Sequence, residues 1–221
     1  MNDDIKAVAL PAVVPIFPLP GVLLLPRARL PLHIFEPRYR VMTEAAIAGD
    51  GVIAMAQPRD AESRDLSPDL YPIACLGRIV EQEQQEDGRW MLTLEGVIRF
   101  IISEECPLKD GYRQVRADYE AFSHDLSPFE GALGLDRDRL LTSLTSFLEG
   151  RGLSADRNAI GRLKDEPLVN ALAMACPFMP AEKQALLEAR DIGERGHLLL
   201  TLLQISATLD AANDDEPPTM N

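Results

Sequence analysis

Short apolar runs separated by prolines open the chain. The runs are Val22–Leu25 and Leu30–Phe35, and prolines stand before, between, within and after them at positions 18, 20, 26, 31 and 37. Proline has no N–H and cannot take part in a central β-ladder. The pattern therefore predicts short strands joined by bends, with Pro20-Gly21 as a tight turn.

The spacing of apolar residues changes after Phe35. Val41, Ala45 and Ala48 recur at intervals of four and three, and a proline at position 37 suits the first turn of a helix. Gly49 is placed to end this helix in a left-handed conformation. We therefore predict a helix after the two apolar runs, with the runs buried and the neighbouring arginines near the surface.

The next part of the chain is rich in strand patterns. Val52–Ala56 is a short apolar run suited to a buried strand. Residues 57–69 are polar and hold two prolines, which favours a loop. Residues 112–122 alternate imperfectly between apolar and polar positions and predict a late strand.

A hairpin is predicted between these segments. Residues 74–85 and 89–102 are two strand patterns that flank Asp87-Gly88, a pair favoured in tight hairpin turns. Gly96 inside the second pattern suggests a bulge or a sharp bend. In total we predict about six mostly antiparallel strands that close into a small twisted β-barrel.

Beyond residue 122 the pattern becomes helical. One face of a helix is formed by Leu140, Leu141, Leu144, Phe147 and Leu148, and residues 193–209 are so rich in leucine that they predict a central helix. The predicted fold class is therefore α+β. The expected divisions are a β-barrel domain at 1–122 with a loose arm at its start, a connector at 123–134, a helical bundle at 135–209 and an acidic, disordered tail at 210–221.

Composition limits the possible functions. The formal net charge is −13, which argues against a general surface for nucleic acid or anionic membranes. No apolar run approaches the length of a membrane span, and the acidic start does not match a secretory signal. Three widely spaced cysteines do not predict disulfides or a metal knuckle, so we expect a cytoplasmic protein.

Sequence motifs for catalysis are missing. A P-loop needs the pattern GxxxxGK[ST], which does not occur, and GxSxG, HExxH and GxGxxG are absent as well. His33, His124 and His197 are scattered, and we interpret His33 as a core histidine. Cys75 and Cys176 are interpreted as buried, inert thiols. We therefore expect no enzyme activity, no cofactor and no metal site.

The remaining candidates are binding residues. Apolar side chains around the first turn and the first helix would hold a peptide if they were exposed, and would otherwise serve the core: Leu19, Val22, Leu23, Phe35 and Tyr39. Four arginines are candidate contacts for an anion or a partner, or would only solvate the strand ends: Arg27, Arg29, Arg38 and Arg40.

Three stretches carry a resemblance to a known family. They read PLPGVLLLP…LPLHIFEPRYRVM near the start, DGRWMLTLEGVIRF at 87–100 and KQALLEARDIGERGHLLLTLL at 183–203. Together they resemble the amino-terminal substrate-binding domain of Lon proteases over roughly residues 14–209. Full-length members continue into an ATPase and a Ser-Lys protease, and we expect this chain to be a stand-alone homologue without either part.

The resemblance implies a PUA-like barrel followed by a helical bundle. It also implies a non-catalytic module of protein quality control that binds unfolded or hydrophobic protein segments, alone or with a protease as partner. PUA-like barrels elsewhere bind RNA, so binding of RNA or of a small molecule is the alternative. The sequence leaves open the ligand and the oligomeric state.

Overall fold

The computed structural model describes residues 10–63, 65, 67–129, 133–154, 156 and 160–214, the last six without their side chains. Internal contacts divide the chain into two units. The first contains residues up to Pro128 together with Pro177–Leu187, and the second contains Phe129–Cys176 and the residues from Glu188 onward. The first unit thus includes a segment of the predicted helical bundle at 135–209.

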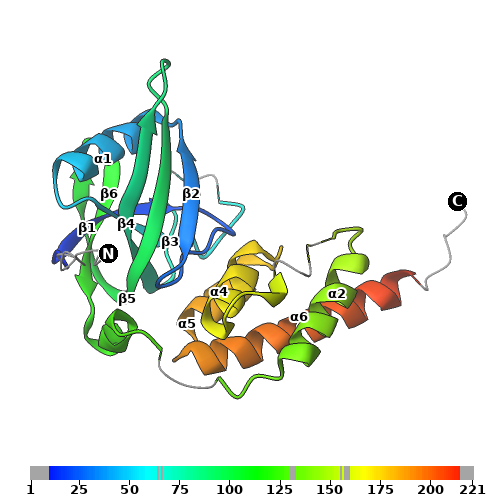
Figure 1. Ribbon diagram of the computed structural model, residues 1–221. Coiled ribbons are helices and arrows are strands. Elements are labelled where there is room, and N and C mark those ends of the chain that lie inside the picture. Colours follow the sequence, from blue (N-terminus) through cyan, green and yellow to red (C-terminus); the bar gives the residue numbers. More distant parts are fainter. Residues whose placement is uncertain are drawn as a thin grey trace, which may run out of the picture. The chain divides into compact units, whose positions relative to one another are not determined.

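The first unit is built on a six-stranded sheet (Figure 1). Its strands are β1 (Val13–Pro18), β2 (Arg29–Ile34), β3 (Val52–Ala56), β4 (Ile73–Gln84), β5 (Trp90–Lys109) and β6 (Tyr112–Asp118). The order is β2-β5-β4-β3-β1-β6, with an additional pairing of β5 and β6. Every pairing is antiparallel except that of β1 with β3.

The predicted α+β class is confirmed, but the sheet is not a clean barrel. Five strands pair in a ring because the long β5 reaches both β4 and β6, whereas β2 is attached to β5 outside this ring. The predicted bend at Gly96 is confirmed, since the β4–β5 register shifts where Gly77 and Gly96 pair. A Cβ on Gly96 would lie 2.0 Å from the carbonyl oxygen of Leu25, so only glycine fits there.

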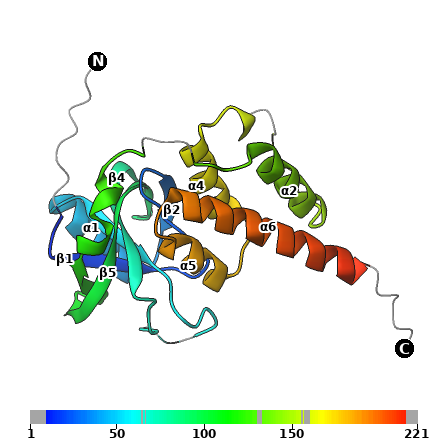
Figure 2. The ribbon, with the colours of Figure 1, turned by 90° about the horizontal axis from the view of Figure 1, so that it is seen from below.

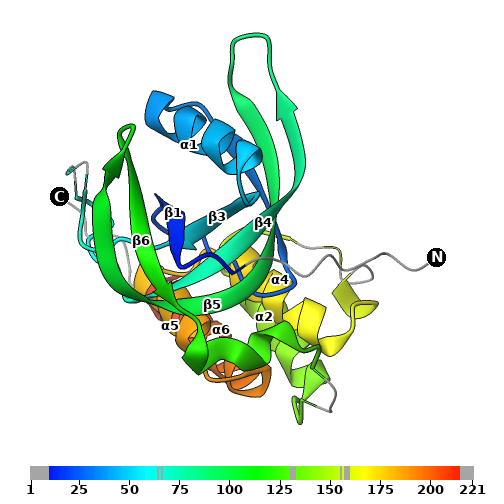
Figure 3. The same cartoon turned by 90° about the vertical axis from the view of Figure 1, so that its left-hand side faces the viewer.

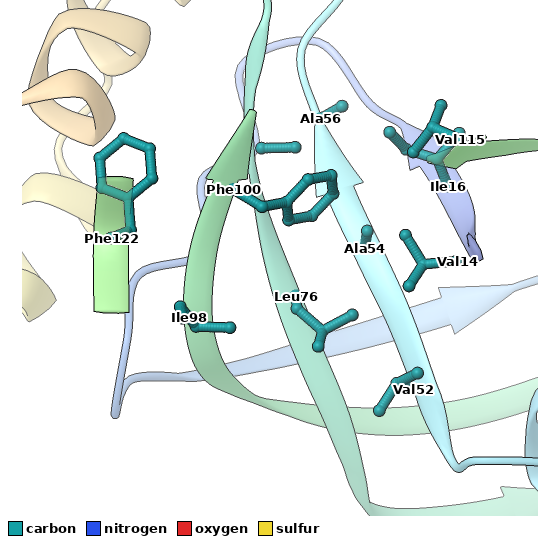
Figure 4. Close-up of a cluster of buried hydrophobic side chains, with 11 residues drawn as sticks. Val14, Ile16, Val52, Ala54, Ala56, Leu76, Ile98, Phe100, Val115 and Phe122 are labelled. Carbon is teal, nitrogen blue, oxygen red and sulfur yellow. The ribbon is translucent and has the colours of Figure 1, made fainter. Parts of the chain in front are cut away.

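The core of the first unit lies between the strands. Figure 4 shows side chains from β1, β3, β4 and β5 pointing into a shared interior, among them Val14, Ala54, Leu76 and Phe100. All four are completely buried. Alternate strand residues point inward because side chains alternate between the two faces of a strand.

Helix α1 (Pro37–Ala48) packs against β1, β3 and β6. It lies between the β4–β5 turn and the β5–β6 turn (Figure 3). The helix and its proline start are confirmed, but its predicted face is wrong: the buried side chains are Tyr39, Met42, Thr43 and Ala46, whereas Val41 is 39% exposed. The left-handed conformation predicted for Gly49 is also wrong, and Gly51 has this conformation instead (φ +69°).

Two further helical elements belong to the first unit. They are the 3₁₀ segment η1 (Glu120–Leu126) and α5 (Pro180–Glu188), except for the last residue of α5. The buried amide of Gln57 donates to the carbonyl oxygen of Pro180 at 3.1 Å, and Gln184 donates to that of Ile73 at 3.1 Å. These bonds tie α5 to the sheet, which explains its grouping.

The second unit is helical. It contains α2 (Arg137–Glu149), α4 (Asp165–Ala175) and α6 (Ile192–Asp214), and both α2 and α4 pack against α6 (Figure 2). Of the predicted apolar face of α2, Leu140, Leu144 and Phe147 are buried, whereas Leu141 and Leu148 are half-buried. Residues 210–214 of the predicted tail are helical, whereas residues 215–221 and the first nine residues of the predicted arm lie outside the described residues.

Candidate functional site

A groove opens on the first unit beside the start of α1. Its walls come from the end of β1 and the turn after it (Phe17–Pro20), from Glu36, Arg38 and Tyr39, and from the loop at 58–68. The cavity volume is about 200 Å³. We refer to it as the α1 groove.

Aromatic side chains form the floor of the α1 groove. The rings of Phe17 and Tyr39 are 4.4 Å apart between centroids, and the Arg38 guanidinium lies 4.5 Å above the Tyr39 ring. Burial raises the pKa of Tyr39, although the charge of Arg38 opposes the shift. The phenol is therefore neutral at physiological pH, and the floor is an uncharged aromatic surface.

Carboxylates surround this floor. Glu36 pairs with Arg38 at 3.2 Å, and Asp60 and Asp65 belong to the opposite wall. That wall is held by Arg113, which is only 5% exposed and donates to the carbonyl oxygen of Pro68 at 2.8 Å while it pairs with Glu105. The groove is thus apolar at its base and acidic at its rim.

A second exposed surface lies on the outward side of β2. Arg29, Pro31 and His33 alternate with inward residues, and Phe35 follows them with 61% of its surface exposed. His33 is opposite Met91 of β5, which is 39% exposed and is itself opposite Glu83 of β4. We call Arg29, Pro31, His33, Phe35 and Met91 the β2 outer face.

The predicted peptide-binding residues are divided among different surroundings. Leu19 and Tyr39 meet in the α1 groove, with Tyr39 only 6% exposed, and Phe35 belongs to the β2 outer face. Val22 is half-buried. Leu23 is 2% exposed and lies in the core, so the suggestion that it contacts a peptide at the surface requires correction.

The four predicted arginines do not gather at one place. Arg38 lines the α1 groove, and Arg29 lies near Glu95 and Glu81 at 3.6 and 4.0 Å. Arg27 donates to the carbonyl oxygen of Asp125, whereas the guanidinium of Arg40 lies against the turn at Gly88. These positions give each arginine local partners rather than a shared anion site.

The predicted core position of His33 is wrong, and one buried ion pair was not predicted. His33 is exposed because it occupies an outward position of the edge strand. The missed pair is Arg99 with Asp125, joined by side-chain bonds of 2.9 Å, and Arg99 also donates to the carbonyl oxygen of Leu187 at 2.9 Å. An arginine inside the apolar run of β5 was the available signal, but its partner lies 26 positions away.

Burial and pairing act in opposite directions on Asp125. Burial alone would raise the pKa of its carboxyl group, but the hydrogen bonds and charge of Arg99 outweigh burial and lower the pKa. Arg99 thereby joins β5, η1 and the end of α5 within one unit. This cluster is structural, because both side chains are almost fully buried.

Two of the three cysteines are buried. The interpretation of Cys75 and Cys176 as buried thiols is confirmed. Within the described ranges, histidine, cysteine and carboxylate side chains form no group of three or more that could hold a metal ion. No helix in the described part of the chain is long and apolar enough to cross a membrane.

Comparison with known proteins agrees with this architecture. Residues 13–204 match the model of the ATP-dependent protease La (LON) substrate-binding domain. Lon protease 2 of Myxococcus xanthus is 27% identical over 199 residues, which cover 88% of this chain and 24% of that protein. Lon protease of Parabacteroides distasonis is also 27% identical, over 198 residues that cover 86% of this chain and 23% of that protein. The chain thus spans about a quarter of the length of these curated relatives.

Solved structures show the same fold. The Lon N-terminal domain protein from Xanthomonas campestris is similar with a TM-score of 0.59 at 20% identity, over 86% of this chain and 97% of that chain. The N-terminal domain of Mycobacterium avium complex Lon protease has a TM-score of 0.59 at 19% identity, over 89% and 98% of the two chains. From the match over residues 13–204, the chain belongs to the LON substrate-binding domain family.

Proposed function

We propose that this chain is a non-catalytic module that binds hydrophobic, partly unfolded segments of other proteins. Membership in the substrate-binding domain family over residues 13–204 is the observation that carries the proposal. The α1 groove supports it, because an apolar floor with a polar rim is typical of sites that hold peptide side chains. Exposed Phe35 adds apolar surface beside the groove, because it precedes Glu36, which lines the groove.

The proposal includes several finer points. We infer that the first unit is PUA-like and the second is a helical bundle, that neither performs chemistry, and that a protease is a partner. We also propose a cytoplasmic location, which is compatible with the three free cysteines. Binding of RNA is not proposed, because Arg29 and Arg38 have carboxylate partners and the net charge is −13.

Fluorescence titration with an unfolded reporter tests the proposal. The reporter is a reduced, carboxymethylated and dye-labelled protein, and we expect saturable binding. Leu19→Asp should weaken binding of the reporter about tenfold, since it places a negative charge in the groove next to the carboxylates of its rim. Leu108→Asp is the matched control, because Leu108 is an exposed leucine of the same unit that does not line the groove.

The result can overturn the proposal. Circular dichroism would first establish that each variant is folded. If the folded parent chain does not bind the reporter even at high micromolar concentration, the chain is not a module for unfolded protein. Equal affinities of Leu19→Asp and Leu108→Asp would remove the α1 groove as the binding site.

A further inference from the structure

Strand β2 has a free edge. Among the described strands it pairs only with β5, and no backbone hydrogen bond from another described segment reaches residues 29–34 on the opposite side. Unpaired N–H and C=O groups on a sheet edge are a template for one more strand. The edge is therefore a surface with main-chain bonding capacity that the fold itself does not use.

The hydrogen-bond pattern identifies the groups on this edge. Gly96 of β5 donates to the carbonyl oxygen of Ala28 at 2.9 Å. The carbonyl group of Ala28, the residue before Arg29, therefore faces β5. Residues of an antiparallel strand alternately face the partner strand and the other side. The main-chain groups of Arg29, Pro31 and His33 therefore point away from β5. Because Pro31 is at such a position, its missing N–H removes no hydrogen bond between β2 and β5.

Exposed apolar side chains accompany these free groups. Phe35 is 61% exposed and follows the strand on the same side as His33, their rings 6.0 Å apart between centroids. Met91, opposite His33, extends the apolar area onto β5. A strand added to this edge would place every second side chain next to the β2 outer face.

We propose that an extended segment of an unfolded polypeptide adds to the free edge of β2 as a further antiparallel strand, with apolar side chains at alternate positions against Pro31, His33 and Phe35. This inference rests on the proposed function and specifies how the substrate is held. Main-chain hydrogen bonds suit a module that binds segments of many different sequences, because every unfolded chain carries the same main-chain donors and acceptors. A folded protein has already used most of these groups.

Charge favours a basic foreign chain over a second copy. Two copies would each bring a net charge of −13 to the contact. The hairpin that begins beside β2 is also acidic, and Glu83 and Glu86 have no ion-pair partner among the described residues. The occupant is therefore an apolar segment with lysine or arginine nearby.

Backbone methylation of a peptide tests strand addition. The probe is an acetylated ten-residue peptide in which leucine and valine alternate with threonine, with lysine at both ends. When the leucine and valine side chains lie on the same side of the sheet as the β2 outer face, their N–H groups point toward β2. N-methylation of these residues removes those donors, so binding should weaken at least about tenfold. N-methylation of the intervening threonines should change affinity less than about twofold, because those donors face solvent.

Two measurements on the protein accompany the peptides. The amide hydrogens of Arg29 and His33 should exchange more slowly with the parent peptide bound than without it. Phe35→Ser should weaken binding about tenfold, whereas Leu108→Ser, at an equally exposed position (61% for both side chains), should not.

The outcomes separate this inference from the proposed function. If the unfolded reporter binds but both methylated peptides bind equally and the two amides are not protected, strand addition is overturned and the proposed function stands. If the reporter does not bind, the proposed function fails first. Protection of Arg29 and His33 that grows with protein concentration in the absence of peptide would assign the edge to a second copy and overturn the inference.

Discussion

Two arginine–carboxylate contacts near β5 use the same chemical groups in opposite surroundings. Arg99 and Asp125 have side chains that are 1% and 6% exposed, and Arg99 makes two side-chain bonds of 2.9 Å to the carboxylate. Arg29 and Glu81 are 63% and 65% exposed, with 4.0 Å between the charged atoms. The first contact is shielded from solvent, and the second is screened by it.

The difference separates stability from binding. Removing one partner of a buried pair leaves an uncompensated charge in a medium of low dielectric constant. Removing a partner of an exposed pair only returns the other charge to water. We therefore expect the fold to depend on Arg99, whereas the exposed residues beside β2 can change with little effect on folding.

The largest effect should follow from Arg99→Leu. It leaves the Asp125 carboxylate buried and breaks the bond to the carbonyl oxygen of Leu187. The free energy of unfolding should fall by about 3–5 kcal/mol in urea titrations. Replacement of both residues by leucine should cost less than the single change, and an equal or larger loss would contradict the reasoning about the stranded charge.

Gly96→Ala should be the next largest. Gly96 lies where the β4–β5 register shifts, and an added Cβ would meet backbone atoms of Leu25 at 2.0 and 2.7 Å. Because backbone cannot move aside as a flexible side chain does, we expect a loss of about 2–3 kcal/mol, measured by the same titration. Gly161→Ala is the control, since no atom lies within 4 Å of its added Cβ.

Acid should weaken the buried pair of Arg99 and Asp125. The pKa of Asp125 is lower in the folded state, so its contribution to stability is fully present above about pH 4 and is lost as the pH falls through the folded-state pKa. The free energy of unfolding should therefore decrease below pH 4. Asp125→Asn should flatten this decrease, and an unchanged pH profile in that variant would assign the acid sensitivity to other carboxylates.

The sequence predicted element types better than side-chain directions. The Asp87-Gly88 pair predicted the hairpin and the run Leu30–Phe35 predicted β2 because these signals act locally, but the strand predicted at Val22–Leu25 was wrong, since that run is not a strand. The placement of His33 and Leu23 was not predictable in this way: it depends on which side of a strand or bend faces the core. Likewise, Arg99 meets Asp125 only after the chain has folded, and a pattern of neighbours does not reveal that contact.

The partition of helices between the units was also beyond local patterns. Helix α5 was predicted as part of the helical bundle at 135–209, because its contacts with the sheet involve residues far away in the sequence. Three hydrogen bonds hold α5 to the rest of the first unit. Gln57 and Arg99 donate to backbone carbonyl oxygens of α5, and the side chain of Gln184 in α5 donates to the carbonyl oxygen of Ile73. For the α1 groove, the sequence supplied Leu19, Arg38 and Tyr39, but the opposite wall comes from the loop at 58–68.

The smallest effect should follow from Arg29→Ala. Its side chain is 63% exposed and lies 3.6 Å from Glu95, which already has a closer partner in Arg78 at 2.8 Å. The free energy of unfolding should change by less than about 0.5 kcal/mol. A loss of stability comparable to that of Arg99→Leu would show that exposure does not distinguish the two contacts, because the exposed arginine would then support the fold as the buried one does.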